Sequence, residues 1–396
     1  MERKVGTVSR GIRCGIIRQG DNLANIVVES VMEASKSENF QIQDKDVVSI
    51  TESIVARAQG NYVSIDDIAQ DVYDKFQDET IGVIFPIMSR NRFSICLKGM
   101  AKKAKKIILM FSYPSDEVGN ALLTLDQIDD AGINPYSDVL TLDKFHELFG
   151  KPIHEFTGVN YVEYYQNIIK ESGCEVEVIF ANQPKEILNY TKYVINCDIH
   201  TRKRTKRVLL ANGAIKVYSL DDIMTHSING SGYNEKYGLL GSNKSTEESI
   251  KLFPQDCFDL VLDVQKQILE LTGKHVEVMV YGDGAFKDPQ GKIWELADPC
   301  VSPAYTDGLV GTPNELKLKY LADNDFKDLK GEELKAAIKN SIINKKDNLV
   351  ADMASQGTTP RQLTDLIGSL SDLTSGSGDK GTPIILISGY FDNYTN

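Results

Sequence analysis

"FDLVLDVQKQILELTGKHVEVMVYGDGA", residues Phe258 to Ala285, contains a complete helix-to-strand transition. Apolar residues recur at helical spacing up to Thr272, and Gly273 is the kind of residue that commonly ends a helix. The apolar run that follows is typical of a buried strand, and it stops at Gly282-Asp283-Gly284. A helix that leads directly into a buried strand indicates an α/β fold.

A second stretch, "VNYVEYYQNIIKESGCEVEVIFANQP" (Val159 to Pro184), repeats this pattern of helix, glycine and Val-Glu-Val strand. The repeat indicates either a scaffold unit that is used twice or a chance recurrence of the common helix-to-strand pattern. The first copy ends in Ala-Asn-Gln-Pro, whereas the second ends in Gly-Asp-Gly-Ala. The shared geometry therefore does not require the Asp283 carboxylate.

The same alternation runs through the N-terminal half. A helix behind a possible Asp21 cap precedes a strand at 44–51, and a turn at Gln59-Gly60-Asn61 leads to a second helix and a strand at 80–87. A helix with a basic face then precedes the strand "KIILMFS". The sequence thus predicts an α/β (α+β mixed) fold with mixed sheets flanked by helices.

Three loops follow or connect these predicted strands. Ser112 to Asn120 lies at the carboxyl end of a strand, where open α/β sheets place ligands. Asn212-Gly213 between apolar runs predicts a strand hairpin. The Gly/Ser-rich loop before "TPIILISGYF" leads into a last strand, whose burial would make C-terminal truncation costly.

Composition excludes several classes of protein. A formal net charge of −12 over 396 residues argues against broad nucleic-acid binding, which needs Lys and Arg to neutralise phosphates. The apolar runs are far shorter than a membrane span, and no signal-peptide pattern opens the sequence. Six scattered cysteines suggest reduced thiols, so we expect a cytoplasmic protein without membrane or nucleic-acid partners.

"YGDGAFKDPQGKIWELADP" (Tyr281 to Pro299) concentrates carboxylates directly after a strand. Asp283, Asp288, Glu295 and Asp298 offer the hard oxygen ligands that Mg²⁺ or Mn²⁺ takes when it bridges nucleotide phosphates. The alternative is a plain hairpin whose Asp-Gly and Asp-Pro pairs serve only as turn residues.

Two glycine-rich loops are candidates for phosphate binding. Gly241 to Lys244 precedes a possible helix near Thr246, and helix-start amides with a lysine bind phosphates. Thr374 to Pro383 carries Lys380 just before a strand. Neither matches the Walker A pattern, so a surface loop is an open alternative for both.

The basic run "TRKRTKR" (Thr201 to Arg207) fits either an anion-binding patch or a solvated connection. His200 beside Asp198 fits either a metal ligand or a surface histidine.

Three stretches together resemble the coenzyme F420-0:L-glutamate ligase (gamma-glutamyl ligase) family. "DKDVVSITESIVARAQG" (Asp44 to Gly60), behind Gly20-Asp21, is similar to the opening of that family. "GSNKSTEESIKLFPQD" and "VMVYGDGAFKDPQGKIWELA" are similar to its Ser-Asn loop and to its metal-binding segment. The resemblance implies that Asp283 is the metal-binding aspartate, Lys287 stands for an arginine, and Glu295 is the second acid.

The sequence also departs from the family. Leu240 stands where the family has an acidic metal ligand before Ser-Asn, so we expect a replacement ligand at Asn243 or Asp288. The stretch from about Pro86 to Arg207 is longer than the family's usual connection. We therefore expect ligase-like core segments at 1–85 and 208–396, with an inserted or expanded α/β subdomain at 86–207.

The resemblance implies an amide ligase that attaches L-glutamate through its amine to a carboxylate acceptor, by way of an acyl phosphate. It implies GTP (or ATP), Mg²⁺ or Mn²⁺ and possibly K⁺, as well as a homodimer. On this reading Asp283 and Lys287 are catalytic and Asp283 and Glu295 bind the metal. The nucleotide contacts are expected at Gly241, Ser242, Asn243, Lys244 and Gly284. A non-catalytic nucleotide- or anion-binding protein on the same fold is the alternative, because Leu240 replaces an acid.

Overall fold

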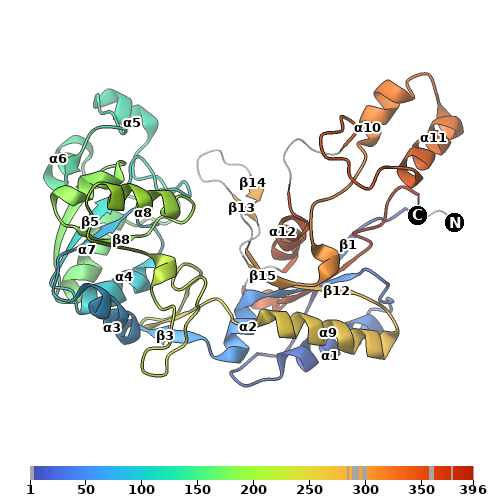
Figure 1. Cartoon of the computed structure of the whole chain (residues 1–396), viewed down its shortest axis with the longest axis horizontal. Helices are drawn as coiled ribbons and strands as arrows, with labels where there is room; N and C mark the ends of the chain where they lie inside the picture. Colours follow the sequence, from blue (N-terminus) through green and yellow to red (C-terminus); the bar gives the residue numbers. More distant parts are fainter. Residues whose placement is uncertain are drawn as a thin grey trace. The chain divides into compact units, whose positions relative to one another are not determined.

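A computed structural model describes residues 4–282, 285–287, 294–296, 301–355, 361–375 and 378–395. The chain divides into two compact units (Figure 1). Unit 1 comprises Met1–Ala58, Asp256–Phe286 and Glu295–Asn396, and unit 2 comprises Gln59–Gln255 and Lys287–Trp294. The predicted inserted segment, 86–207, lies within unit 2, which begins earlier and ends later along the chain.

Unit 1 contains a five-stranded mixed sheet in the order β1-β16-β2-β12-β15. Its members are β1 (Val8–Ile12), β16 (Ile384–Ser388), β2 (Val47–Thr51), β12 (Glu277–Gly282) and β15 (Val301–Tyr305). Only β2 and β12 are parallel, and the other three pairs are antiparallel. The predicted final strand is confirmed as β16, with Ile384 to Ile387 buried between two neighbouring strands.

Helices cover both faces of this sheet. α1 (Leu23–Ser37) and α9 (Cys257–Thr272) pack together against one face, and α12 (Leu363–Ser375) lies against the other (Figure 1). The sequence predicted α1, but its expected cap is wrong: Asn22 accepts the Asn25 amide at 3.2 Å, whereas Asp21 accepts the Arg18 amide. Helix α2 (Glu52–Gln59) follows β2 directly.

A separate part of unit 1 between β15 and α12 is helical. It contains the short α10 (Leu318–Tyr320), a π-helical turn at Leu321–Asp325 and α11 (Gly331–Ile343).

Unit 2 contains a six-stranded sheet in the order β6-β7-β5-β4-β8-β9. Its strands are β4 (Ile81–Ile84), β5 (Lys106–Phe111), β6 (Leu140–Thr141), β7 (Glu175–Phe180), β8 (Tyr193–Asn196) and β9 (Lys216–Ser219). All neighbours are parallel except β6, which pairs antiparallel with β7 at the edge.

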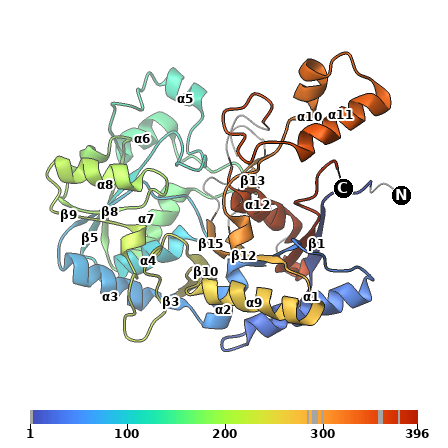
Figure 2. The same cartoon turned by 45° about the vertical axis from the view of Figure 1, so that its right-hand side comes forward.

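This second sheet is doubly wound. The helices α3 (Ile65–Phe76), α4 (Phe93–Lys102) and α7 (Tyr161–Glu171) pack on one face, while η1 (Pro184–Asn189) and α8 (Arg202–Ala211) pack on the other. Figure 2 shows α8 and α3 on opposite sides of β5 and β8. The chain builds outward from β4 to β5 and β7, and then returns to β8 on the other side of β4. Short helices α5 (Leu125–Asp130) and α6 (Leu142–Phe149) lie between β5 and β7 along the chain.

The predicted hairpin at Asn212-Gly213 is wrong. These residues end helix α8, with Asn212 as its cap and Gly213 in the left-handed region at φ +93°. The flanking strands β8 and β9 are parallel neighbours, which a two-residue turn cannot join. Asn-Gly tolerates left-handed backbone both in hairpins and at helix ends, and here the helix end is the correct reading.

The predicted helix near Thr246 is also wrong. β10 (Asn243–Thr246) and β11 (Ser249–Lys251) form an antiparallel hairpin instead, and β11 pairs with β3 (Tyr62–Ser64). Thr246 and Ser249 hydroxyls lie 2.8 Å apart across the turn. The phosphate seat that this helix start would have supplied is therefore not formed by the described residues.

The mixed α/β class and both helix-to-strand repeats, α7 with β7 and α9 with β12, are confirmed. A further two-stranded sheet consists of β13 (Ala285–Lys287) and β14 (Trp294–Leu296). In the described part of the chain, no helix has the length and apolar character needed to cross a membrane.

Candidate active site

The parallel strands β2 and β12 end side by side in unit 1. Tyr281 of β12 is level with Thr51 of β2, so the two chains leave the sheet at the same edge. From β12 the chain continues through Gly282 to Asp283, which with Gly284 lies outside the described residues. From β2 it continues into Glu52, the first residue of α2. Such carboxyl edges are where α/β sheets place their ligands.

Glu52 is an acid that the sequence analysis did not single out. It is only 5% exposed, although glutamate is almost never fully buried unless it has a partner. The position of Glu52 directly after a strand parallel to β12 is the signal that would have identified it. That signal becomes readable only when the pairing of β2 with β12 is known.

Two other predicted site residues lie on the small sheet. Lys287 is the last residue of β13, and Glu295 is the middle residue of β14, so the fold pairs the strands that carry them. The side chains of both residues lie outside the described part. Asp288 and Asp298 lie outside it altogether.

The predicted nucleotide-binding run, Gly241 to Lys244, belongs to unit 2. A β-carbon on Gly241 would collide with the Phe253 ring, so close packing requires glycine there. Ser242 is 4% exposed, and its hydroxyl lies 3.4 Å from the thiol of Cys96 in the first turn of α4. Burial raises the pKa of that thiol to about 11, so it is an inert packing group at neutral pH.

The next two residues of the run contact the loop that joins β4 to α4. Asn243 Oδ1 accepts a hydrogen bond from Arg92 Nε at 3.0 Å, and the Lys244 amide donates to the Asn91 carbonyl at 2.6 Å. The Lys244 ammonium pairs with Glu247, which lowers the pKa of that exposed carboxyl. The run is thus attached to the carboxyl edge of strand β4.

A family model described as F420-0:Gamma-glutamyl ligase matches residues 11–389 of the chain. The chain belongs to the F420-0:gamma-glutamyl ligase family. The match includes both units and confirms the family indicated by the three sequence stretches. Among curated proteins, none matches the chain significantly.

Leu240, where the family resemblance leads us to expect an acid, is half-buried and packs against the main core of unit 2. An ionised side chain at that position would lose part of its hydration. Among the described residues, no three His, Cys, Asp or Glu side chains group as a metal centre.

The loop Ser112 to Asn120, predicted to bind ligands, is held by internal contacts in this ligase-family chain. Buried Asp116 accepts the amides of Met88, Val118 and Asn120 and the Asn120 side chain at 2.8–3.1 Å. Burial raises the Asp116 pKa, and these four donors oppose the shift. This carboxylate is therefore a structural centre of the loop.

The basic run at 201–207 forms the beginning of α8. Arg202 pairs with Asp221 at 2.6 Å and Lys206 pairs with Asp222 at 2.7 Å. Thr205 is buried, whereas His200 is exposed to solvent. Two of the cations are thus engaged in ion pairs within unit 2, and the run is part of a helix.

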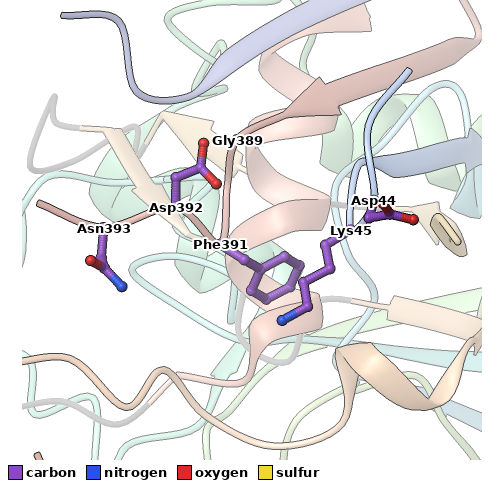
Figure 3. A pocket seen from close by; sticks show the side chains of 6 residues that line it. All are labelled: Asp44, Lys45, Gly389, Phe391, Asp392 and Asn393. Carbon is purple, nitrogen blue, oxygen red and sulfur yellow. The ribbon is translucent and has the colours of Figure 1, made fainter. Parts of the chain in front are cut away.

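A hollow of about 320 Å³ lies at the other end of the unit 1 strands (Figure 3). Asp44 and Lys45, before β2, line it together with Gly389, Phe391, Asp392 and Asn393, after β16. The Lys45 side chain extends beside the Phe391 ring, while Asp392 and Asn393 point elsewhere. This hollow lies at the amino end of β2, so it is distinct from the edge that carries Glu52.

Proposed function

We propose that the chain is a nucleotide- and divalent-metal-dependent ligase that joins L-glutamate to a carboxylate acceptor. The observation that carries this proposal is the carboxyl edge of β2 and β12, where a buried Glu52 and the chain entering Asp283 leave one sheet together. Family membership over residues 11–389 supports a gamma-glutamyl ligase. The nucleotide, the metal and the acceptor are parts of the proposal.

Carboxylates are hard oxygen donors of the kind that a divalent cation takes. Asp283 and Glu295 are the acids that the family resemblance assigns to the metal, and we add Glu52, the first residue of α2, as a third carboxylate. We infer that Glu52 supplies the acid that Leu240 lacks, in place of Asn243 or Asp288. Mg²⁺ or Mn²⁺ held there would neutralise charge on the nucleotide phosphates.

The proposed reaction has two steps. An oxygen of the acceptor carboxylate attacks the terminal phosphorus of GTP or ATP, and the bond from phosphorus to the nucleoside diphosphate breaks. The glutamate amine then attacks the activated carbonyl carbon, loses its proton and expels phosphate. Lys287 is assigned to the transferring phosphoryl group, where a cation offsets developing negative charge.

The nucleotide contacts that the family resemblance implies are Gly241 to Lys244 in unit 2 and Gly284 in unit 1. In unit 2 the Lys244 ammonium is paired with exposed Glu247, so phosphate binding requires it to exchange this carboxylate for the nucleotide. Removing the competitor by Glu247→Gln should tighten nucleotide binding, whereas Lys244→Ala should weaken it by about tenfold, the usual effect of losing a charge-assisted contact. Calorimetric titration with GTP and with ATP measures both changes.

The decisive test is turnover by the purified chain. We expect nucleoside diphosphate and phosphate to be released only when Mg²⁺ or Mn²⁺, L-glutamate and an acceptor acid are all present. Mass spectrometry of candidate acceptors identifies the amide product. Asp283→Asn and Glu52→Gln should each lower turnover by about 100-fold or more, as loss of an electrostatic contact to a reacting group does.

One result would contradict the whole proposal, and a second would contradict only the role of Glu52. The chain could bind nucleotide without any turnover, and Asp283→Asn could change only the affinity. These results together would identify a non-catalytic nucleotide-binding protein. Full activity in Glu52→Gln would remove Glu52 from the metal site and leave the rest intact. Leu271→Gln, at an exposed position of α9, is the control that should leave turnover unchanged.

A further inference from the structure

The sheet of unit 2 has a topological switch point between β4 and β8, where the direction of winding reverses. Strands β4 and β8 are parallel neighbours, and the chain winds away from β4 on one side before it returns to form β8 on the other. In open α/β sheets, ligands bind at the carboxyl ends of the two strands at such a point. Here these ends lead to the loop 85–92 and to Cys197-Asp198.

Asp198, two residues after β8, is a buried acid with one carboxylate oxygen that accepts no hydrogen bond from the described residues. It is 3% exposed, and one carboxylate oxygen accepts the hydroxyls of Thr205 at 2.5 Å and Thr201 at 3.2 Å. The other oxygen, Oδ1, has no hydrogen-bond partner among the described residues. A buried carboxylate oxygen left unpaired is costly, so a donor that the protein itself does not supply would stabilise it.

Glu117 brings a second carboxylate to the same edge. It comes from the loop after β5 and accepts the amides of Ile199 and His200, the residues that follow Asp198. The residue as a whole is exposed, while its carboxylate end is desolvated against these amides. Desolvation raises the Glu117 pKa, and the neighbouring Asp198 charge raises it further. The two carboxylates thus include one on an exposed residue, Glu117, and one that is buried, Asp198.

Arg202 is the cation near Asp198, and its charge lowers the Asp198 pKa without removing the rise that burial causes. Arg202 is held by Asp221 and by the Ile199 carbonyl. Two adjoining carboxylates and one unpaired buried oxygen call for a small cationic group with several hydrogens to donate. An ammonium group has three N–H donors and one positive charge. A divalent metal fits less well, because the described residues provide no third His, Cys, Asp or Glu side chain for it.

Backbone strain coincides with this position. Phe85, the residue directly after β4, has φ +55°, in the left-handed region that a bulky residue rarely adopts. Its amide is fixed by the Met110 carbonyl at 2.9 Å, and the Cys197 amide is fixed by the Ile84 carbonyl at the same distance. Strained residues of this kind concentrate at ligand sites.

We propose that Asp198 and Glu117 bind the ammonium group of the amino-acid substrate, at the carboxyl edge of β4 and β8. The identity of that substrate rests on the ligase function proposed above. The two carboxylates would accept the N–H donors of the amine in its protonated form.

The test is calorimetric titration of the full chain with four probes: L-glutamate, glutarate, methylamine and Mg²⁺. L-Glutamate should bind and glutarate, which lacks the amine, should not. Asp198→Asn keeps the size of the side chain and its threonine contacts, and it should weaken L-glutamate binding by about tenfold or more, as should Glu117→Gln. Asp130→Asn, at an exposed acid on α5, is the matched control and should bind like the wild type.

Unaltered L-glutamate binding in folded Asp198→Asn and Glu117→Gln would overturn the proposal, as would no binding to the wild type. The proposal would also be overturned if both variants lost Mg²⁺ binding but kept L-glutamate binding. Turnover separates this proposal from the ligase function. A chain that turns over, with a glutamate KM unchanged in both variants, refutes only the ammonium site. Glutamate binding that depends on Asp198, in a chain without turnover, refutes only the ligase.

Discussion

Leu240 and Glu52 differ in how far the sequence alone reveals them. The acid missing at Leu240 is visible in the sequence, because Leu240 stands at a defined place in a recognisable motif. Glu52 is not visible in this way, because its position depends on the register between β2 and β12, which are more than 200 residues apart along the chain. Local sequence patterns indicate helices and strands, but they do not determine the register in which distant strands pair.

Restoring the family acid by Leu240→Asp should destabilise the protein and should not raise activity. Leu240 packs against the core of unit 2, so a carboxylate there costs about 2–4 kcal/mol of unfolding free energy. Leu240→Met, which keeps an apolar side chain of similar volume, should cost less than about 1.5 kcal/mol. Urea unfolding with turnover assays measures both. A gain in activity for Leu240→Asp would mean that the metal site does use this position.

The pH dependence of stability should include a contribution from Asp198. Burial raises its pKa above the usual 3.8, so the folded chain holds this proton more tightly than the unfolded chain does. Its contribution to stability is therefore full below the usual pKa and is lost as the pH rises through the folded pKa. As the pH rises from about 4, the unfolding free energy of Asp198→Asn should therefore decrease less than that of the wild type.

Asp44 provides a control of opposite sign. The His275 amide and the Lys274 side chain lower its pKa, so its contribution is present above the usual pKa and is lost in acid. Asp44→Asn should remove a small part of the stability gained on raising the pH. Chemical unfolding at a series of pH values distinguishes the two variants, and the same slope for both would contradict the assignment.

Helix α8 explains the largest error in predicting elements from the sequence. Seven residues rich in Arg and Lys have weak apolar periodicity, and Asn212-Gly213 gives a turn signal that fits two structures. The parallel pairing of β8 and β9, which requires a crossover, decides between them. By contrast, α7, α9 and their strands were predictable, because strong periodicity, a terminal glycine and a β-branched run agree with one another.

The final strand should be essential for folding of unit 1. β16 is buried and pairs with both β1 and β2, so its removal exposes two strand edges and the apolar residues Ile384 to Ile387. A chain that ends at Gly381 should be insoluble or lack cooperative unfolding. A chain that ends at Asn393 keeps the strand and is the control. Solubility and thermal unfolding provide the measurement, and a folded shorter chain would contradict the prediction.

Unit 2 should fold by itself. Residues 59–255 form one continuous stretch with its own doubly wound sheet and two apolar cores. The isolated stretch should therefore show helix and strand signals in circular dichroism and a single cooperative urea transition. Loss of cooperativity would mean that the remaining chain is needed. The same stretch carrying Gly82→Leu, which would drive a side chain into Ile187, is the unstable control.

The pairing of β1 with β16 has a consequence for synthesis on the ribosome. Strand β1 can pair only after β16 has been synthesised, because nearly the whole chain separates Val8 from its partner Ser388. The continuous stretch Gln59–Gln255 of unit 2, with its whole six-stranded sheet, has left the ribosome while β12, β15 and β16 are still to come. Nascent chains should therefore acquire protease-resistant structure in the middle of the sequence first, with an exposed N-terminal segment that needs protection until translation ends.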